Sequence, residues 1–143
     1  MKIILFFYNQ RGINVLEYLK SKHQIILSIL SKKYLNNKIC SYLKKKNYNF
    51  IIIQDVNNKK LIDKIKKLKP DLNVIAGFPY IFKRKLIYSS LYGTINLHAG
   101  SLPNYRGGSP LNWQIINDSK NVTLTIIKIN DGIDTGPILA ESK

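Results

Sequence analysis

The 143-residue sequence is poor in cysteine, arginine and acidic side chains, and it has no long apolar segment. Its single cysteine, Cys40, excludes an internal disulfide framework and a zinc site built from cysteines. The longest apolar runs, such as Ile25–Leu30, are far shorter than the ~20 residues that a membrane helix needs. The first apolar run also lacks the cleavage site of a signal peptide. We therefore expect a cytoplasmic protein with one domain, residues 1–143, and no membrane partner.

Acidic residues are scarce, because 8 aspartates and glutamates face 23 lysines and arginines, for a formal charge of +15. Such a charge can indicate a nucleic-acid-binding protein. However, only three of the basic residues are arginines, the residue type that reads guanine edges and forks onto phosphates. Over Lys59–Lys69 the lysines surround apolar residues at helical spacing, which predicts a helix with a lysine-covered outer side. We prefer this solvated helix face as the interpretation, with a nucleic-acid surface as the alternative.

Glycine-rich phosphate loops are missing as well. The loop after the first apolar run reads Tyr-Asn-Gln-Arg-Gly, with one glycine where a dinucleotide fingerprint has three. The sequence also has no Gly-Lys-Ser/Thr motif of a phosphate-binding loop. NAD and ATP are therefore poor candidates for ligands.

Six apolar segments are predicted to be strands, and amphipathic segments alternate with them. The strands are expected at Lys2–Phe7, Gln24–Leu30, Phe50–Ile53, Leu72–Ala76, Gly93–His98 and Val122–Ile129. The helices are expected at Arg11–Ser21, Lys38–Lys46, Lys59–Lys69 and Phe82–Ser89. Because most strands are continuously apolar, they indicate a parallel sheet that is covered on both faces. The expected fold is α/β, a doubly wound, mainly parallel, Rossmann-like sheet.

Ligands of such sheets bind at the carboxyl ends of the strands, so the loops after the first, fourth, fifth and sixth strands are the candidate positions. Asn96 and His98 are two residues apart in the fifth strand and therefore project to the same face. A neutral imidazole can accept a proton, and an amide NH2 can donate to a developing oxyanion. If the fifth and sixth strands are neighbours, Asp134 can approach His98 and orient its ring. This set suggests proton transfer around an acyl group rather than a covalent acyl-enzyme.

Each of these features also has a purely structural explanation. A histidine at a strand end can simply close hydrogen bonds, and the two aspartates of the later loop can be turn residues. The segment Ala99–Pro110 is rich in turn formers, so a long shaped loop is expected there. Trp113, together with Leu111, Ile115 and Ile116, is expected in the core rather than in a stacking platform.

Taken together, the motifs resemble those of the folate-dependent formyltransferases. The matching segments are Asn96-Leu97-His98, Leu102-Pro103-Asn104-Tyr105-Arg106-Gly107, Pro110-Leu111-Asn112-Trp113 and Asp134-Thr135-Gly136. The family has an aspartate 36 residues beyond the motif histidine, and Asp134 stands at this distance from His98. The sequence departs from the family at one place. The family often has His-x-Ser-Leu-Leu-Pro, and the corresponding residues here are His98-Ala99-Gly100-Ser101-Leu102-Pro103, so the serine is moved by one position. The resemblance covers nearly the whole chain.

The resemblance implies the formyltransferase fold and the transfer of a formyl group from 10-formyltetrahydrofolate to a primary amine, without a metal. The implied catalytic residues are Asn96, His98 and Asp134. The residues expected around the pterin ring of the folate are Phe78, Pro79, Tyr80, Ile129 and Ile133. Arg106 and Tyr105 are expected near the acceptor, where Arg106 meets either a substrate phosphate or a partner within its own loop.

The family has three classes of acceptor: methionyl-tRNA, glycinamide ribonucleotide, and amino sugars on nucleotides. The tRNA enzymes usually carry a basic, glycine-containing insertion after the second strand, which the short segment Ser31–Asn37 lacks. The motifs between Asn96 and Gly136 look more like those of the sugar-acting branch. We therefore expect a small amine substrate, a nucleotide-linked amino sugar, with methionyl-tRNA as the alternative.

A second alternative follows from the length of the chain. It ends nine residues beyond Asp134, whereas members of the family normally continue with more of the catalytic domain. A truncated, non-catalytic module that binds folate is therefore also considered. The sequence leaves open which amine is used and whether the protein forms a homo-oligomer.

Overall fold

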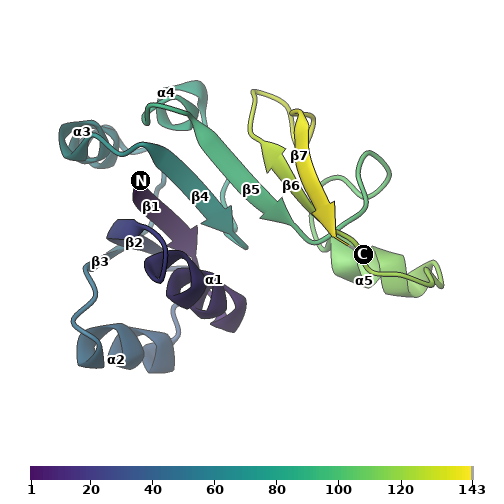
Figure 1. Cartoon of the computed structure of the whole chain (residues 1–143), viewed down its shortest axis with the longest axis horizontal. Helices are drawn as coiled ribbons and strands as arrows, with labels where there is room; N and C mark the ends of the chain where they lie inside the picture. The colour runs from purple at the N-terminus through teal and green to yellow at the C-terminus, as the bar shows by residue number, and fades with distance from the viewer. Residues whose placement is uncertain (143) are drawn as a thin grey trace.

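The computed structural model describes residues 1–142, and its central feature is a seven-stranded sheet (Figure 1). The strands are β1 (Lys2–Phe7), β2 (Gln24–Ser31), β3 (Phe50–Ile53), β4 (Leu72–Ala76), β5 (Thr94–His98), β6 (Leu124–Lys128) and β7 (Ile138–Ser142). The helices are α1 (Gln10–Lys20), α2 (Asn37–Lys45), α3 (Lys59–Leu68), α4 (Arg84–Ile87) and α5 (Pro110–Ile116). The strand order is β3-β2-β1-β4-β5-β6-β7, parallel from β3 to β5 and antiparallel for the last two pairs. The expected α/β, mainly parallel, doubly wound sheet is confirmed.

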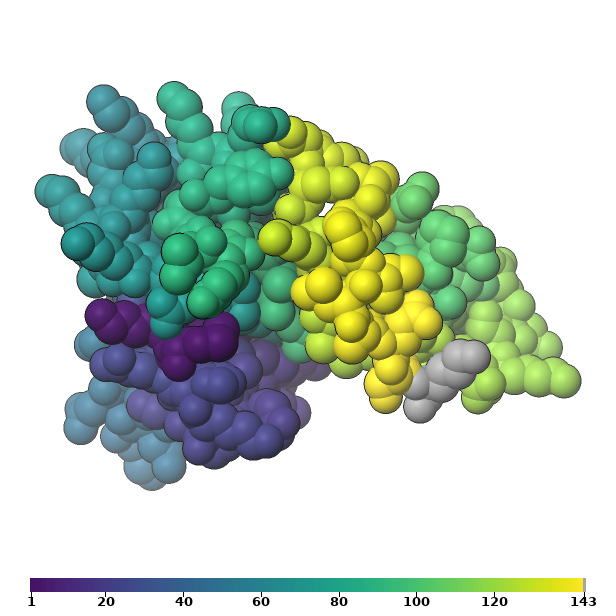
Figure 2. All heavy atoms as spheres, turned by 45° about the horizontal axis from the view of Figure 1, so that its top comes forward, coloured from purple at the N-terminus to yellow at the C-terminus, as the bar shows by residue number. Residues whose placement is uncertain are grey.

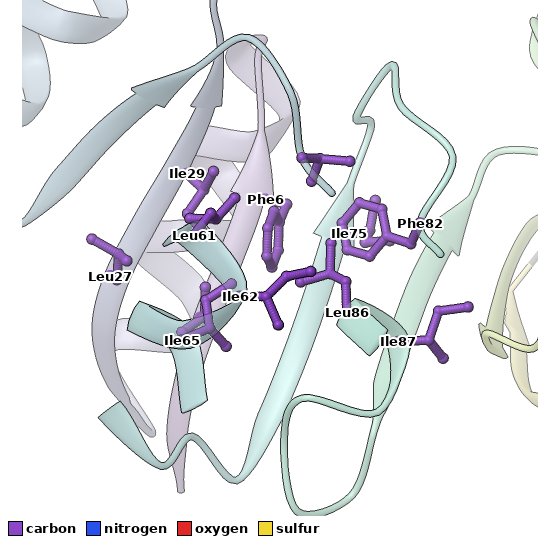
Figure 3. Close-up of a cluster of buried hydrophobic side chains, with 12 residues drawn as sticks. Phe6, Leu27, Ile29, Leu61, Ile62, Ile65, Ile75, Phe82, Leu86 and Ile87 are labelled. Carbon is purple, nitrogen blue, oxygen red and sulfur yellow. The ribbon is translucent and has the colours of Figure 1, made fainter. Parts of the chain in front are cut away.

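Helices cover both faces of the parallel part of the sheet. On one face, Leu16 of α1 and Leu43 of α2 pack in a cluster with Leu5 and Phe7 of β1. The other face carries a second cluster that includes α3 and α4 (Figure 3). Because β1 is buried on both faces, its sequence is a continuous apolar run rather than an alternating one.

Phe6 occupies the centre of the second cluster, between the residues of α3 and those of α4 (Figure 3). Its ring centroid lies 4.8 Å from that of Phe82 and 5.6 Å from that of Phe78, both in edge-to-face geometry. Such aromatic pairs add stabilisation to the burial of apolar area. The loop after β4, which begins at Gly77, is therefore anchored to the core through Phe78.

Asparagine caps begin the first three helices. The side chains of Asn9, Asn36 and Asn58 each accept a hydrogen bond from a backbone N–H of the first turn. In α1 the position of Gly12 also requires glycine, because a Cβ there would lie 2.3 Å from the Cβ of Phe7. The first turn of α1 therefore packs directly onto the end of β1.

The amphipathic helix expected around residues 59–69 is confirmed as α3. Its buried residues are Leu61, Ile62 and Ile65, and its lysines are exposed. Within residues 1–142, no helix is both long and apolar enough to span a membrane.

The structure differs from the sequence-based prediction beyond β5, where α5 and β7 were not expected. The exposed fraction is 54% for Trp113, 65% for Ile115 and 69% for Ile116, so the prediction that they belong to the core is wrong. The physical reason is that α5 lies at the far end of the molecule, away from both apolar clusters (Figures 1 and 2). Its buried residue is the polar Gln114, with 1% exposure.

Candidate active site

Asn96 and His98 lie on β5 at positions that face the same side of the sheet. In the antiparallel pairing with β6, Asn96 is opposite Ile127 and His98 is opposite Thr125. The side chain of His98 is 5% exposed, and Asn96 is half-buried. β5 therefore delivers an amide and an imidazole to one face, as the two-residue spacing predicted.

Asp134 completes the group. Its Oδ2 atom lies 3.4 Å from Nδ1 of His98 and accepts a 2.9 Å hydrogen bond from the backbone N–H of Gly107. Its Oδ1 atom accepts a 3.4 Å hydrogen bond from Nδ2 of Asn96. The carboxylate is held among these donors with a side-chain exposure of 11%. The structure thus brings together the three residues that the sequence proposed as catalytic.

The route by which Asp134 reaches His98 differs from the expected one. Since β6 is antiparallel to β5, its last residue Lys128 pairs with Ile95, so β6 ends at the opposite edge from His98. The prediction that all four loops extend from one edge is therefore wrong for the loop after β6. Asp134 meets His98 because this loop returns over the sheet face, with Asp134 itself in the left-handed conformation at φ 49°.

Both ring nitrogens of His98 face hydrogen-bond acceptors. Nε2 lies 2.5 Å from the carbonyl oxygen of Tyr105, and a carbonyl only accepts, so Nε2 carries the hydrogen. Nδ1 faces the Asp134 carboxylate, which when ionised also only accepts. His98 therefore lies between a carboxylate and a backbone carbonyl.

The two residues expected near the acceptor, Tyr105 and Arg106, both lie beside the group formed by Asn96, His98 and Asp134. The Tyr105 hydroxyl is hydrogen-bonded to Ser119 and also accepts from Asn117, and these bonds lower the pKa of Tyr105. The Arg106 side chain is exposed, and its Nε donates to the backbone carbonyl of Asp134 at 3.2 Å. The bond joins two loops, so it is not the partner within its own loop that the sequence suggested, and contact with a substrate phosphate stays a prediction.

Sequence reasoning missed two buried polar residues behind the site, Gln114 and Thr125. Gln114 is hydrogen-bonded to the carbonyl of Ala99, and Thr125 to the carbonyl of Gly100. Thr125 had a signal in the sequence, since threonines alternate with apolar residues in that strand and so share one face. Gln114 had none, because a single glutamine between apolar residues does not indicate burial.

Comparison with known proteins identifies the family. The model of the formyl transferase family matches residues 2–143. The chain belongs to the formyl transferase family. Methionyl-tRNA formyltransferase of Clostridium beijerinckii is 40% identical over 87 residues, which cover 61% of this chain and 28% of that protein. The bifunctional polymyxin resistance protein ArnA of Wigglesworthia glossinidia brevipalpis is 34% identical over 99% of this chain and 23% of its own. The chain thus spans well under half the length of these curated relatives.

Solved structures of formyltransferases share the fold. Phosphoribosylglycinamide formyltransferase of Bacillus halodurans superposes with a TM-score of 0.82 at 20% identity, over 99% of this chain and 78% of that one. WlaRD, a sugar 3N-formyl transferase whose structure was determined in the presence of dTDP and 5-N-formyl-THF, gives 0.74 at 20% identity. It is matched over 99% of this chain and 51% of its own. The expected formyltransferase fold is thus confirmed.

The loops expected to border the pterin ring in this formyl transferase domain meet on one apolar cluster. Phe78, Tyr80 and Ile129 are half-buried and pack against the cluster around Phe6. Ile133 is 55% exposed, and the contacts of that cluster include neither it nor Pro79. The structure therefore brings three of the five expected residues together.

An ion pair joins the two loop regions at the surface. Nη1 of Arg84, in the first turn of α4, lies 2.7 Å from Oδ2 of Asp131, with both side chains largely exposed. Among the described residues, no group of three histidines, cysteines or acidic residues is arranged to hold a metal ion. Two shallow surface hollows lie away from the candidate active site, one beside Lys22 and one along α3.

Proposed function

We propose that this chain transfers a formyl group from 10-formyltetrahydrofolate to a primary amine. The observation that carries the proposal is the convergence of Asn96, His98 and Asp134 on one sheet face, within a domain of the formyl transferase family. The three residue types supply an amide donor, an imidazole and a carboxylate, which is the set that acyl transfer between two nitrogens requires.

The reaction needs a donor for the oxygen of the formyl group, because that oxygen gains negative charge when the amine attacks the formyl carbon. Asn96 can provide it, since its NH2 group has two hydrogens and only one is directed to Asp134. A donor fixed in advance stabilises the developing charge without reorganisation. Asn96 is therefore assigned to the oxyanion.

The reaction also needs a proton to leave the attacking amine and one to reach the departing nitrogen of the folate. His98 and Asp134 form the pair suited to this transfer. The carbonyl of Tyr105 occupies Nε2 of His98, so contact of this nitrogen with a substrate requires that the loop carbonyl be displaced. A movement of the loop after His98 therefore accompanies substrate binding in this proposal.

For the formyl donor, the half-buried side chains of Phe78, Tyr80 and Ile129 supply an apolar border suited to a flat ring. The role of Pro79 and Ile133 in this border is part of the same proposal. When bound, the folate supplies the formyl group, and the chain supplies the pocket and the polar residues next to it.

As the acceptor we propose a nucleotide-linked amino sugar. The support is the similarity of the loop motifs to the sugar-acting branch and the short β2–α2 connection, residues 32–36, which leaves no room for the insertion typical of the tRNA enzymes. A sugar 3N-formyl transferase is also among the proteins with the same fold. Arg106, at the rim beside Asp134, is placed to meet an anionic part of such a substrate.

Methionyl-tRNA is the second candidate, because the curated relative with 40% identity acts on it by name. The charge distribution also favours this candidate, since residues 1–109 carry 20 of the 23 basic residues and four of the eight acidic ones. A surface of this charge attracts phosphate backbones, and the affinity then falls steeply with salt.

The catalytic proposal predicts that His98→Ala lowers kcat by about 10²- to 10⁴-fold, the range typical for loss of a general acid or base. The measurement is formation of tetrahydrofolate from 10-formyltetrahydrofolate with a saturating amine acceptor. His23→Ala is the matched control, because His23 is the other histidine of the chain and lies outside the catalytic group. Equal activity of His98→Ala and wild type would refute the role of His98.

The acceptor is tested by mass spectrometry after incubation with 10-formyltetrahydrofolate. Amino-sugar nucleotides and methionyl-tRNA are offered in parallel, and a mass increase of one formyl group identifies the substrate. Formylation of the tRNA alone, with salt-dependent affinity, would replace the sugar by the second candidate. Binding of the folate without any formylated product would leave a binding module without turnover.

A further inference from the structure

We propose that Gln114 of α5 is the positioning residue for His98. The effect on catalysis rests on the proposed function, because His98 belongs to the same site. The effect on the position of His98 does not depend on whether the protein turns over a substrate. The hydrogen bonds of Gln114 within residues 1–142 go to Ala99, Pro110 and Thr123, and not to His98 or Asp134. It acts through the peptide groups that follow His98 in the chain.

Gln114 is buried, with 1% exposure, and its amide group is fully engaged with the backbone. Nε2 donates to the carbonyl of Ala99 at 2.9 Å and to the carbonyl of Pro110 at 3.3 Å. Oε1 accepts from the backbone N–H of Thr123 at 3.2 Å. One side chain therefore ties the residue after His98 to α5 and to the segment that enters β6.

The next peptide group is held in the same way. The Thr125 hydroxyl donates to the carbonyl of Gly100 at 2.7 Å, and Thr125 stands opposite His98 in the β5–β6 pairing. Two consecutive carbonyls after His98, those of Ala99 and Gly100, are thus fixed by buried side chains. The first two residues after His98 are therefore held in place where the chain leaves β5, whereas Tyr105, whose carbonyl has to be displaced in the proposed reaction, lies farther along the loop.

Gly100 transmits this restraint to the imidazole ring. A Cβ at Gly100 would lie 2.9 Å from Nε2 of His98, 3.0 Å from the carbonyl oxygen of Tyr105 and 2.6 Å from Cβ of Pro110. The backbone at Gly100 is therefore in direct contact with both the ring and its carbonyl partner. A displacement of this backbone therefore changes the distance from Nε2 to its acceptor.

The one departure from the family motif lies at this place. The position held by serine in His-x-Ser-Leu-Leu-Pro is Gly100 here, and a glycine has no side chain with which to anchor the loop. Gln114 supplies an anchor from another element of the structure. Because its amide does not titrate, its contribution is geometric and not a proton transfer.

The test is the variant Gln114→Met, which keeps the length of the side chain and removes all three hydrogen bonds. The readout is ¹⁵N–¹H NMR of the imidazole groups in uniformly labelled protein. In the wild type, the Nε2–H of His98 is buried and donated to a carbonyl, so its proton is expected to exchange slowly enough to be observed. In Gln114→Met we expect this signal to shift or to disappear through exchange.

Asn73→Leu is the matched control, because it should lower the stability of the protein without moving the His98 ring. Asn73 is another fully buried amide on the sheet, and its Nδ2 donates to Ser89 and Thr94 rather than to the loop. We expect Asn73→Leu to leave the His98 signal in place at a comparable fall in Tm. His23 provides an internal reference in both variants.

Kinetics connect the geometry to the proposed function. For Gln114→Met we expect kcat to fall about 10- to 100-fold with KM changed less than about twofold, as for a misplacement of catalytic groups by around an ångström. An unchanged His98 signal in Gln114→Met, or equal changes in both variants, would overturn the positioning role. If the wild type shows no formyl transfer, the proposed function fails while the NMR result still decides the position of His98.

Discussion

Two regions of the molecule are held together by different forces. Within residues 1–142, the region before β5 contains 22 of the 24 buried apolar residues, and the region from β5 onward contains only Leu102 and Ile127. The second region instead buries five polar residues, which are Thr94, His98, Gln114, Thr123 and Thr125. The first region is therefore an apolar core, and the second is organised mainly by hydrogen bonds.

The difference explains where the site lies. Apolar packing is not directional, so it gives stability without fixing the angle of a single side chain. Hydrogen bonds have a preferred length and angle, so they can hold His98 and Asp134 in one relative orientation. The proposed catalytic group lies in the second region, while the first supplies most of the apolar cluster that is proposed to border the folate.

The largest expected effect on stability belongs to the apolar region. Phe6→Ala should lower the free energy of unfolding by about 3–5 kcal/mol, because it leaves a cavity between Phe78 and Phe82. Urea denaturation followed by circular dichroism measures the loss. Leu91→Ala is the control, since Leu91 is 73% exposed and should change stability by less than about 0.5 kcal/mol. Similar losses in both variants would contradict the picture of an apolar core around Phe6.

A smaller effect is expected in the hydrogen-bonded region. Thr125→Val keeps the shape of the side chain but leaves the Gly100 carbonyl without its buried partner, which should cost about 1–3 kcal/mol. The same urea titration applies. Thr123→Val is the matched control, because its hydroxyl has no hydrogen bond among those found within residues 1–142. Equal losses for the two valines would mean that the hydroxyl of Thr125 does not hold the loop.

The smallest effect concerns a polar contact on the outside of the apolar region. The Tyr42 hydroxyl donates to Glu17 at 2.8 Å, and this bond, followed by burial, raises the pKa of Tyr42 above 10.0. A raised pKa means that the stabilisation is fully present below pH 10 and is lost as the pH rises through the folded-state value. Tyr42→Phe should therefore lower Tm at pH 7, and the difference from wild type should shrink above pH 10.

Thermal unfolding at several pH values measures this difference. The control is the same substitution in a Glu17→Gln background, where the acceptor has no charge and the pH dependence should be weaker. A difference in Tm that stays constant above pH 10 would show that Tyr42 does not act through its hydroxyl proton.

The fold of the apolar region could be predicted because a strand that is buried on both faces of the sheet has a continuous apolar sequence. The expected bounds of Lys2–Phe7, Phe50–Ile53 and Leu72–Ala76 agree with β1, β3 and β4. The same signal fails in the second region, where α5 exposes its large apolar residues and β7 is exposed along its whole length. The start of α5 was also hidden, since Ser109 precedes it in a left-handed conformation without a side-chain cap.

The sequence predicted that Asn96, His98 and Asp134 lie close together, but not how they are brought together. Spacing placed Asn96 and His98 on one face, and adjacency of β5 and β6 allowed Asp134 to approach. The return of the loop after β6 and the carbonyl of Tyr105 at His98 depend on backbone conformation, which a residue pattern does not reveal.

The direction of the strands has a consequence for the order of folding. β6 and β7 form an antiparallel hairpin in which Leu124 pairs with Ser142, whereas β1 and β4 pair Ile3 with Leu72 across a much longer stretch of chain. Closing a long loop costs more conformational entropy than closing a short one, so the hairpin is expected to form before the parallel sheet is complete. His98 belongs to a strand that pairs with both β4 and β6, while Asp134 belongs to the hairpin. The approach of Asp134 to His98 during refolding, and with it the proposed activity, should therefore follow the late joining of the two regions and not the early formation of the hairpin.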